Sequence, residues 1–118
     1  MYSVIDIESN GAGFRKESII EIAVFKYDGH QIVDQFISLV NPDAPITPFV
    51  QKLTNITPKM VLTAPKFHEI ARRVVEITQN TTLVGHNIEF DYRMLRQEFR
   101  RLGYEFKINT LDTIPLAK

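Results

Sequence analysis

Hydrophobic positions in the first forty residues predict three β-strands. Apolar residues, mostly Ile, Val and Phe, dominate residues 2–8, 18–27 and 31–40 in runs too short for core helices. Asp28 and Gly29 separate the second and third runs, which predicts a two-residue turn between antiparallel strands. Residues 2–8 are apolar toward both faces until the acids at their end. We therefore expect this strand to be central and covered on both faces.

The rest of the chain predicts helices that alternate with short strands. Thr47 and Thr57 each precede a proline, a pattern typical of the cap and first turn of a helix. They predict short helices, the first of them from Pro48 to Leu53. Longer helices are predicted for residues 66–78 and 87–102, strands for 82–84 and 107–110, and the start of a helix for 111–118. This order predicts a mixed α/β sheet with helices packed on its faces.

Both long helices carry an apolar stripe with the spacing of one helix face. The first stripe consists of Phe67, Ile70, Val74 and Ile77. The second consists of Ile88, Leu95, Phe99 and Leu102, and Asp91 interrupts it in the first turn. We expect Asn87 to cap this second helix and Gly103 to end it.

Three acids stand where a buried carboxylate needs compensation. Asp6 and Glu8 are two residues apart on the first strand, so their side chains share a face. Asp91 lies on the core-facing stripe of a helix, where it either complements the helix dipole or serves the chemistry of a site. If the three converge, they repel one another unless a cation lies between them. Hard divalent cations take oxygen ligands, so the trio predicts a metal site.

Composition narrows the class of protein. The 118 residues are enough for one domain with a modest core, and Lys plus Arg equals Asp plus Glu at 14 each. A net charge of zero argues against a polybasic nucleic-acid binder but not against a nuclease that holds its substrate through metals. There is no cysteine and no apolar run near the ~20 residues of a membrane span. We expect a cytoplasmic protein without a membrane partner.

Two motifs resemble a known family. Asp6-Ile7-Glu8, followed by a turn of small residues, resembles the first motif of the DEDD superfamily of 3′–5′ exonucleases, and residues 85–91, Gly-His-Asn-x-x-Phe-Asp, resemble the second. Residues 19–23, 53–57 and 111–113 match further stretches of the branch that contains the proofreading subunit of bacterial DNA polymerase III. The resemblance runs in order along essentially the whole chain. It implies a ribonuclease H-like fold, a mixed β-sheet with flanking helices.

The resemblance also implies a mechanism. Family members use two Mg²⁺ or Mn²⁺ ions, ~4 Å apart, to clamp the scissile phosphate and activate a water. By resemblance, Asp6 would bridge both ions, Glu8 would hold the ion that activates the water, and Asp91 would hold the ion facing the leaving oxygen. The implied substrate is the 3′ end of single-stranded DNA. RNA remains an alternative substrate, because a nuclease distinguishes RNA from DNA through local contacts with the 2′-OH, which the sequence does not define.

Further positions would contact the terminal nucleotide by resemblance. In the turn after the first strand, the Ser9 hydroxyl and nearby backbone N–H groups would bind the nucleotide. Leu53 and Ile56 would contact its base, and Asn87 and Phe90 of the second motif would line the cleft. These positions are Ser9, Asn10, Gly11, Leu53, Ile56, Asn87 and Phe90. The family commonly has Glu-Thr-Thr-Gly where residues 8–11 are Glu-Ser-Asn-Gly, and a frequent His-Gly is here Thr54-Asn55. Asn10 is therefore expected to alter the contact with the terminal sugar.

One part of the family pattern is missing. The third motif supplies a general base, usually His, and a fourth acid, but none of the 27 residues after Asp91 forms it. We expect residues 1–118 to be an incomplete, C-terminally truncated exonuclease domain with impaired activity, whose uncovered sheet surface favours self-association. Similar domains occur as polymerase subunits, as free-standing enzymes and fused to UvrC-like endonuclease domains. A catalytically silent nucleic-acid- or partner-binding module and an exonuclease for short RNA are the alternatives.

A group of arginines has two interpretations. Arg93, Arg96 and Arg100 follow one another at helical spacing, and Arg101 joins them. They either guide a phosphate backbone or form a solvated face near a helix C-terminus, where cations are favoured.

Overall fold

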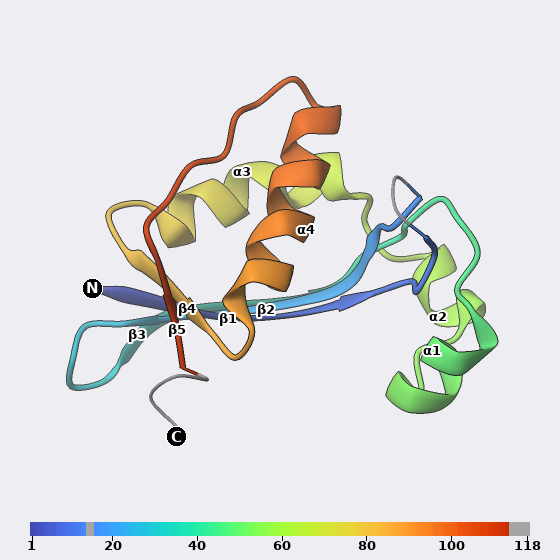
Figure 1. Cartoon of the computed structure of the whole chain (residues 1–118), viewed down its shortest axis with the longest axis horizontal. Helices are drawn as coiled ribbons and strands as arrows, with labels where there is room; N and C mark the ends of the chain where they lie inside the picture. The colour runs from blue at the N-terminus through green and yellow to red at the C-terminus, as the bar shows by residue number, and fades with distance from the viewer. Residues whose placement is uncertain (14–15, 114–118) are drawn as a thin grey trace.

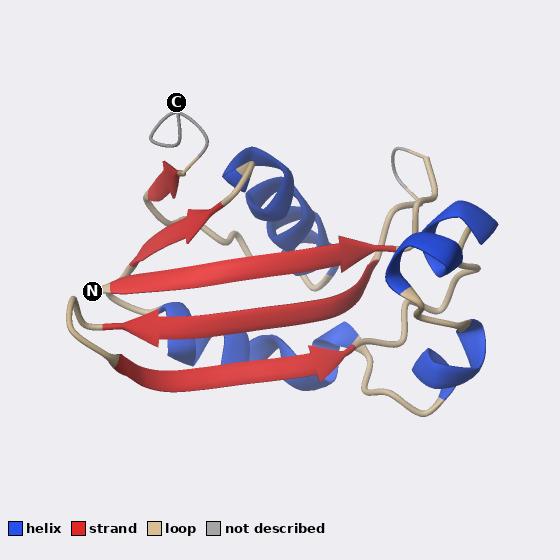
Figure 2. Ribbon diagram, turned by 90° about the horizontal axis from the view of Figure 1, so that it is seen from below, coloured by secondary structure: helices blue, strands red, loops and turns tan. Residues whose placement is uncertain are grey.

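A central strand with neighbours on both sides organises the chain. The computed structural model describes residues 1–13 and 16–113. Five strands form one sheet in the order β3-β2-β1-β4-β5, and they lie side by side in Figure 2. Their bounds are β1 Tyr2–Ser9, β2 Ile19–Tyr27, β3 Ile32–Leu39, β4 Thr82–Gly85 and β5 Thr110–Asp112. The β1–β2 and β2–β3 pairs are antiparallel, whereas β1–β4 and β4–β5 are parallel. The predicted mixed sheet with a central first strand is confirmed.

The hairpin between β2 and β3 has a longer turn than predicted. Residues 28–31 connect the strands, and of these only Gly29 has a positive φ, at 106°. A two-residue type I′ turn needs positive φ at both central residues. Instead the Asp28 carboxylate accepts hydrogen bonds from the backbone N–H groups of His30 at 2.8 Å and Gln31 at 2.9 Å. An aspartate that satisfies two turn amides stabilises the longer connection.

Among the described residues, helices cover only one face of the sheet. α3 (Phe67–Thr78) and α4 (Ile88–Arg101) both lie on the face that Ile5 and Ile7 enter (Figure 1). On the opposite face, turned to the viewer in Figure 2, Tyr2 and Val4 are each 42% exposed. The prediction of a strand covered on both faces was therefore wrong for the described residues. Apolar side chains show that a face can be buried, but not what covers it.

The two long helices confirm their predicted stripes except at one end. The four stripe residues of α3 are buried, and so are Ile88, Leu95 and Phe99 of α4. Leu102 is 45% exposed, because it follows the last turn of α4 and no longer points along the helix face. Phe99 anchors the core between the helices, with its ring 5.0 Å from Phe67 and stacked 4.8 Å from Phe106.

Two short helices stand beside the C-terminal end of β1 (Figure 1). They are α1 (Pro48–Thr54) and α2 (Pro58–Leu62), and both begin as predicted, because Thr47 accepts a hydrogen bond from Val50 and Thr57 from Met60. A second small core holds them, consisting of Ile20, Ile46, Val50, Ile56 and Val61. This second core attaches the short helices to β2.

The last part of the described chain differs from prediction. The final strand is Thr110–Asp112, not 107–110, so residues 111 and 112 belong to a strand and not to a helix. Pairing with β4 sets this position, since Val84 lies opposite Leu111. Residues 114–118 of the predicted helix lie outside the described residues. Among the described helices, none is long and apolar enough to cross a bilayer.

Candidate active site

The pleat of β1 presents two carboxylates on the uncovered face. Ile5 and Ile7 point toward α3 and α4, so Asp6 and Glu8 point the other way. Asp6 is exposed and Glu8 is half-buried. Glu8 lies opposite Glu21 of β2, an arrangement that adds a further negative charge to this end of the sheet.

Asp91, the third acid, lies at the edge of β1 beyond Val4. Pairing between β1 and β4 ends at Val4 opposite Val84, so the following part of β1 has no strand neighbour on that side within the described part of the chain. Asp91, in the first turn of α4, is 4% exposed and receives a hydrogen bond from the backbone of Ile7 on this free edge. Acids of β1 and α4 therefore lie near the same stretch of backbone, although Glu8 and Asp91 are 83 residues apart in the sequence.

A glycine lets the helix come this close. A Cβ atom at Gly85 would lie 3.2 Å from Oδ2 of Asp91 and 3.3 Å from the carbonyl oxygen of Ile5. Both distances are tighter than ordinary van der Waals contact for a carbon atom. Gly85, the first residue of the second motif, thus has a steric role, because the absence of a Cβ atom lets α4 lie against the free edge of β1.

Mutual repulsion marks the three acids as one electrostatic cluster. Burial raises the pKa of Asp91 to about 7, with the charges of Asp6 and Glu8 and then Asp112 adding to the effect. Burial also raises the pKa of Glu8, and Asp6 and Glu21 raise it further. A buried carboxylate whose pKa is raised by neighbouring negative charges marks a place that a cation would stabilise.

The donor set is suited to a hard cation, although it is not closed in this conformation. Within residues 1–13 and 16–113, no group of three or more His, Cys, Asp or Glu side chains is arranged as a ready set of metal ligands. Asp6 is exposed, so rotation of its side chain meets no packing cost. The site offers only carboxylate oxygens, the ligands that Mg²⁺ and Mn²⁺ prefer.

The turn after β1 is held against α1. The Ser9 hydroxyl accepts a hydrogen bond from the backbone N–H of Gly11 at 3.2 Å. Gly11 has φ +78°, and a Cβ atom there would lie 2.5 Å from Oγ1 of Thr47 and 2.6 Å from Cγ2 of Val50. The predicted substrate turn therefore depends on a glycine in contact with the first turn of α1.

The Asn10 side chain is directed inward, which corrects its predicted role. It is fully buried, its amide nitrogen donates to the carbonyl oxygens of Lys16 and Pro45, and its amide oxygen accepts from the backbone N–H groups of Ala12 and Ser18. A side chain with these four partners has no group left for a nucleotide. We reassign Asn10 as a residue that ties the turn to the loop before α1.

The other predicted substrate contacts divide into exposed and buried residues. Leu53 is 68% exposed and Asn87 is also exposed, whereas Ile56 is 4% exposed and belongs to the second core. Ile56 therefore has a packing role in the core, and its contact with a base stays a prediction. Phe90 is half-buried, with the guanidinium of Arg93 5.4 Å from its ring centre.

Two acids hold α4 against its neighbours, and neither was assigned a role from the sequence. Glu98 of α4 is 7% exposed and accepts a hydrogen bond from the backbone N–H of Ile19 at 3.0 Å, and Arg101 pairs with it at 3.1 Å. Asp112 accepts a hydrogen bond from Asn87 at the start of α4. The spacing of Glu98 and Arg101 was the available signal, since residues three apart on a helix are neighbours. The contact with Ile19, across 79 residues, leaves no local pattern.

Solved structures share this architecture. Exonuclease X, solved in complex with 5′ overhanging duplex DNA, superposes with a TM-score of 0.78 and 29% identity over 99% of this chain and 62% of its own. Exonuclease I without ligand superposes with a TM-score of 0.87, at 18% identity, over 98% of this chain and 29% of its own. The fold is therefore the ribonuclease H-like fold of exonucleases, as the motifs predicted.

Sequence similarity defines the family. The profile of the exonuclease family that includes ribonuclease T matches residues 3–118, so this chain belongs to that family of exonucleases. DNA polymerase III PolC-type of Caldanaerobacter subterraneus subsp. tengcongensis is 36% identical over 117 residues, which cover 99% of this chain and 8% of that protein. The 3′-5′ exonuclease DinG of Staphylococcus epidermidis is 31% identical over 118 residues, 99% of this chain and 13% of that protein. The chain thus spans about a tenth of the length of these relatives.

Proposed function

We propose that this chain is the nuclease domain of a 3′–5′ exonuclease that removes nucleotides from DNA 3′ ends. One observation carries the proposal: the buried Asp91 accepts a hydrogen bond from the backbone of Ile7 at the free edge of β1, where the charges of Asp6 and Glu8 help burial to raise its pKa. Membership of the exonuclease family and the similarity to a 3′-5′ exonuclease support the reaction class. The likeness to exonuclease X, which was solved with DNA, supports DNA over RNA.

We propose Asp6, Glu8 and Asp91 as the ligands of Mg²⁺ or Mn²⁺. When bound, two such ions polarise the scissile phosphate and lower the pKa of an attacking water. The carboxylates of this chain supply the negative charge that holds the cations, and the hydrogen bond from Ile7 fixes the orientation of Asp91. With these ions bound, the Asp91 carboxylate would be in its ionised form at neutral pH.

Other residues position the strand end. We propose that the backbone of Ser9 and Gly11 contacts the terminal nucleotide, that Leu53 packs against the terminal base, and that Asn87 and Phe90 line the cleft. Leu53 suits this role because it is 68% exposed on a helix that packs against the Gly11 turn. An exposed apolar side chain beside a site is well placed to make apolar contact with the face of a base.

We further propose that the domain works beside a DNA-processing partner. Two kinds of arrangement fit: a DNA polymerase, as the similarity to a PolC-type polymerase suggests, or a fused UvrC-like endonuclease domain. We also propose that these 118 residues assayed alone hydrolyse DNA slowly, because they contain no counterpart of the family's third motif.

The test is a cleavage assay with matched variants. A 5′-labelled single-stranded DNA is incubated with the chain and Mn²⁺, beside Asp6→Ala, Asp91→Asn, an EDTA control and Asp28→Ala, which removes an acid from the distant β2–β3 turn. We expect a ladder that shortens from the 3′ end and is at least about 100-fold weaker in the two site variants, because even the residues that support metal ligands contribute about 10–100-fold. Asp28→Ala should retain wild-type activity.

Each other outcome has a defined meaning. DNA binding without a ladder at any metal concentration would contradict the enzyme and favour a silent binding module. Faster shortening of an RNA of the same sequence would move the substrate from DNA to RNA. A ladder that survives Asp6→Ala would contradict the assignment of the site.

A further inference from the structure

The outer face of α4 carries two arginines that no carboxylate neutralises within the described part of the chain. Arg96 and Arg100 are both exposed, and their spacing of four residues places them on the same side of the helix. Arg93 and Arg101 differ, because each is ion-paired to a glutamate, at 3.2 and 3.1 Å. Two of the four arginines are therefore held in ion pairs, which neither interpretation predicted, and Arg96 and Arg100 have no carboxylate partner among the described residues.

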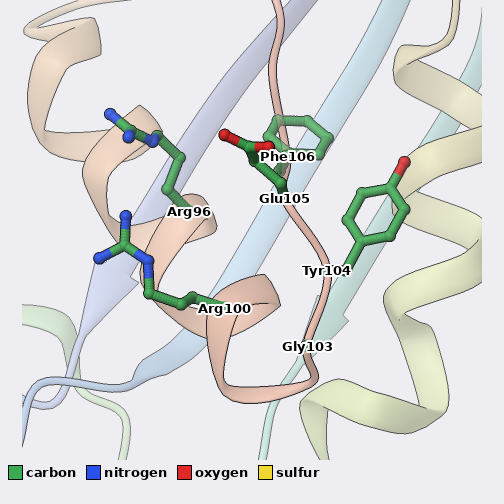
Figure 3. A pocket seen from close by; sticks show the side chains of 6 residues that line it. All are labelled: Arg96, Arg100, Gly103, Tyr104, Glu105 and Phe106. Carbon is green, nitrogen blue, oxygen red and sulfur yellow. The ribbon is translucent and has the colours of Figure 1, made fainter.

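A hollow lies beside these two arginines. Gly103, with φ +78°, ends the helix, and the chain turns back along it. The space between α4 and this returning segment is a hollow of about 350 Å³, lined by Arg96, Arg100, Gly103, Tyr104, Glu105 and Phe106 (Figure 3). In Figure 3 both arginines extend from the helix, and Glu105 and Phe106 belong to the segment that runs past them.

A neighbouring hollow extends the same surface toward β5. It shares Arg96 and adds Lys107 with the amide side chains of Asn80 and Asn109. Glu105, the acid of the first hollow, pairs with Lys107 at 3.4 Å. This pair is 75% exposed on both sides, so it leaves Arg96 and Arg100 as the net positive charge of the surface.

The two arginines are suited to bind successive phosphate groups of a phosphodiester backbone. Guanidinium groups bind phosphate oxygens through two parallel hydrogen bonds. The Cα atoms of Arg96 and Arg100 are about 6 Å apart along the helix axis, as four residues of rise dictate. The guanidinium of Arg96 lies over the Tyr92 ring, 5.4 Å from its centre, and this contact reduces the freedom that it would lose on binding.

We propose that Arg96 and Arg100 bind the phosphodiester backbone of a nucleic acid strand, at a point remote from the end that is cleaved. This inference rests on the proposed function, because that function supplies the strand. Arg100 is nine residues beyond Asp91, about 13 Å along α4, so the surface is separate from the three acids. It adds affinity for long substrates without contacting the reacting atoms.

The test measures binding in EDTA, where no cleavage is expected. Fluorescence anisotropy gives the affinity for a labelled single-stranded 20-mer at several salt concentrations, for the wild type and Arg96→Ala/Arg100→Ala. Each phosphate contact on single-stranded nucleic acid contributes about 0.7 to the salt slope, so the double variant should lose about 1.4. If the affinities agree at 1 M salt, this slope predicts a loss of about 25-fold at 0.1 M salt.

A matched control removes the same charge elsewhere. Arg72→Ala/Lys59→Ala changes two exposed cations on α3 and α2 that line neither hollow. An equal loss of slope in this control, or an unchanged slope in Arg96→Ala/Arg100→Ala, would overturn the proposal. Tighter binding of dTMP or of an acidic peptide than of the 20-mer, lost in the same variant, would also overturn it in favour of that ligand.

A second assay separates this proposal from the proposed function. The p-nitrophenyl ester of dTMP is too short to reach both sites, and its hydrolysis with Mn²⁺ reports on the three acids alone. We expect the double arginine variant to hydrolyse it at the wild-type rate, whereas Asp6→Ala does not. If the wild type fails to hydrolyse it but binds the 20-mer with the arginine-dependent slope, the proposed function fails and the strand-binding surface stands.

Discussion

The carboxylate of Asp112 accepts a hydrogen bond from the backbone N–H of Asn87 at 3.0 Å. Asn87 is the N-cap residue of α4, with φ +64°, and its own side chain makes no capping hydrogen bond. Asn87 thus holds the predicted N-cap position without a side-chain cap, and its own N–H is bound by an acid that comes 25 residues later, from β5. The helix that carries Asp91 therefore depends on the last described strand for its start.

Removal of this hydrogen bond should weaken the fold. We expect Asp112→Ala to lower the free energy of unfolding by about 1 kcal/mol, a typical net value for an intramolecular hydrogen bond. Asp112→Asn keeps an oxygen that accepts the hydrogen bond, so it should lose less. Urea unfolding at pH 5.5 is the measurement, because Asp91 is then mostly protonated and repulsion between the two acids is small. An alanine variant as stable as the wild type would show that the contact contributes nothing.

The stability of the metal-free protein should fall as the pH rises through neutrality. Burial raises the pKa of Asp91 to about 7 from an ordinary value of 3.8, so between these two values the folded state binds a proton that the unfolded chain has released. Stability therefore decreases from about pH 4 to pH 7 and levels off above. The shift corresponds to roughly 4 kcal/mol.

Urea unfolding in EDTA at pH 5, 6, 7 and 8 checks this dependence. Asp91→Asn removes the titrating group while keeping its shape, so the variant should lose most of the decline and be more stable than the wild type at pH 8. Mn²⁺ should stabilise the wild type at pH 8 and leave the variant nearly unchanged. Parallel pH curves for the two proteins would refute the assignment to Asp91.

Substitution of Gly11 should destabilise the protein, and Gly13, two residues later, provides a matched control. Gly11→Ala places a methyl group 2.5 Å from Oγ1 of Thr47 at a positive φ, so it should destabilise the protein by more than about 1 kcal/mol. Gly13→Ala meets no heavy atom within 4 Å and should change stability by less than about 0.5 kcal/mol. Thermal unfolding of both variants gives the comparison. Equal effects would mean that α1 does not constrain the turn.

The uncovered sheet face should promote self-association. Its apolar side chains include Tyr2 and Val4 at 42% exposure, Ile37 at 57% and Leu111 at 41%. Such a surface tends to bind another apolar surface. We expect light scattering to show a mass that rises with concentration, and Ile37→Lys to reduce the rise. Leu62→Lys, at a 71% exposed position on α2, should not reduce it. A monomeric mass at high concentration would contradict the prediction.

Local patterns in the sequence were sufficient for most elements of this fold. The caps at Thr47 and Thr57, the stripe of α3 and the end of α4 before Gly103 were all predictable, because each depends on contacts within a few residues. The motif residues Asp6, Glu8 and Asp91 were also identified in the sequence, since their order and spacing carry the family resemblance.

What the sequence could not determine depends on contacts between distant segments. The pairing of β1 with β4 only as far as Val4 opens the edge that Asp91 reaches. The inward direction of Asn10 and the hydrogen bond from Asn87 to Asp112 follow from how loops and strands meet in three dimensions. Packing against helices on one face alone decided that Tyr2 and Val4 stay exposed. Alternation along a strand shows which residues share a face, but only the tertiary structure decides which face is covered and which acids meet.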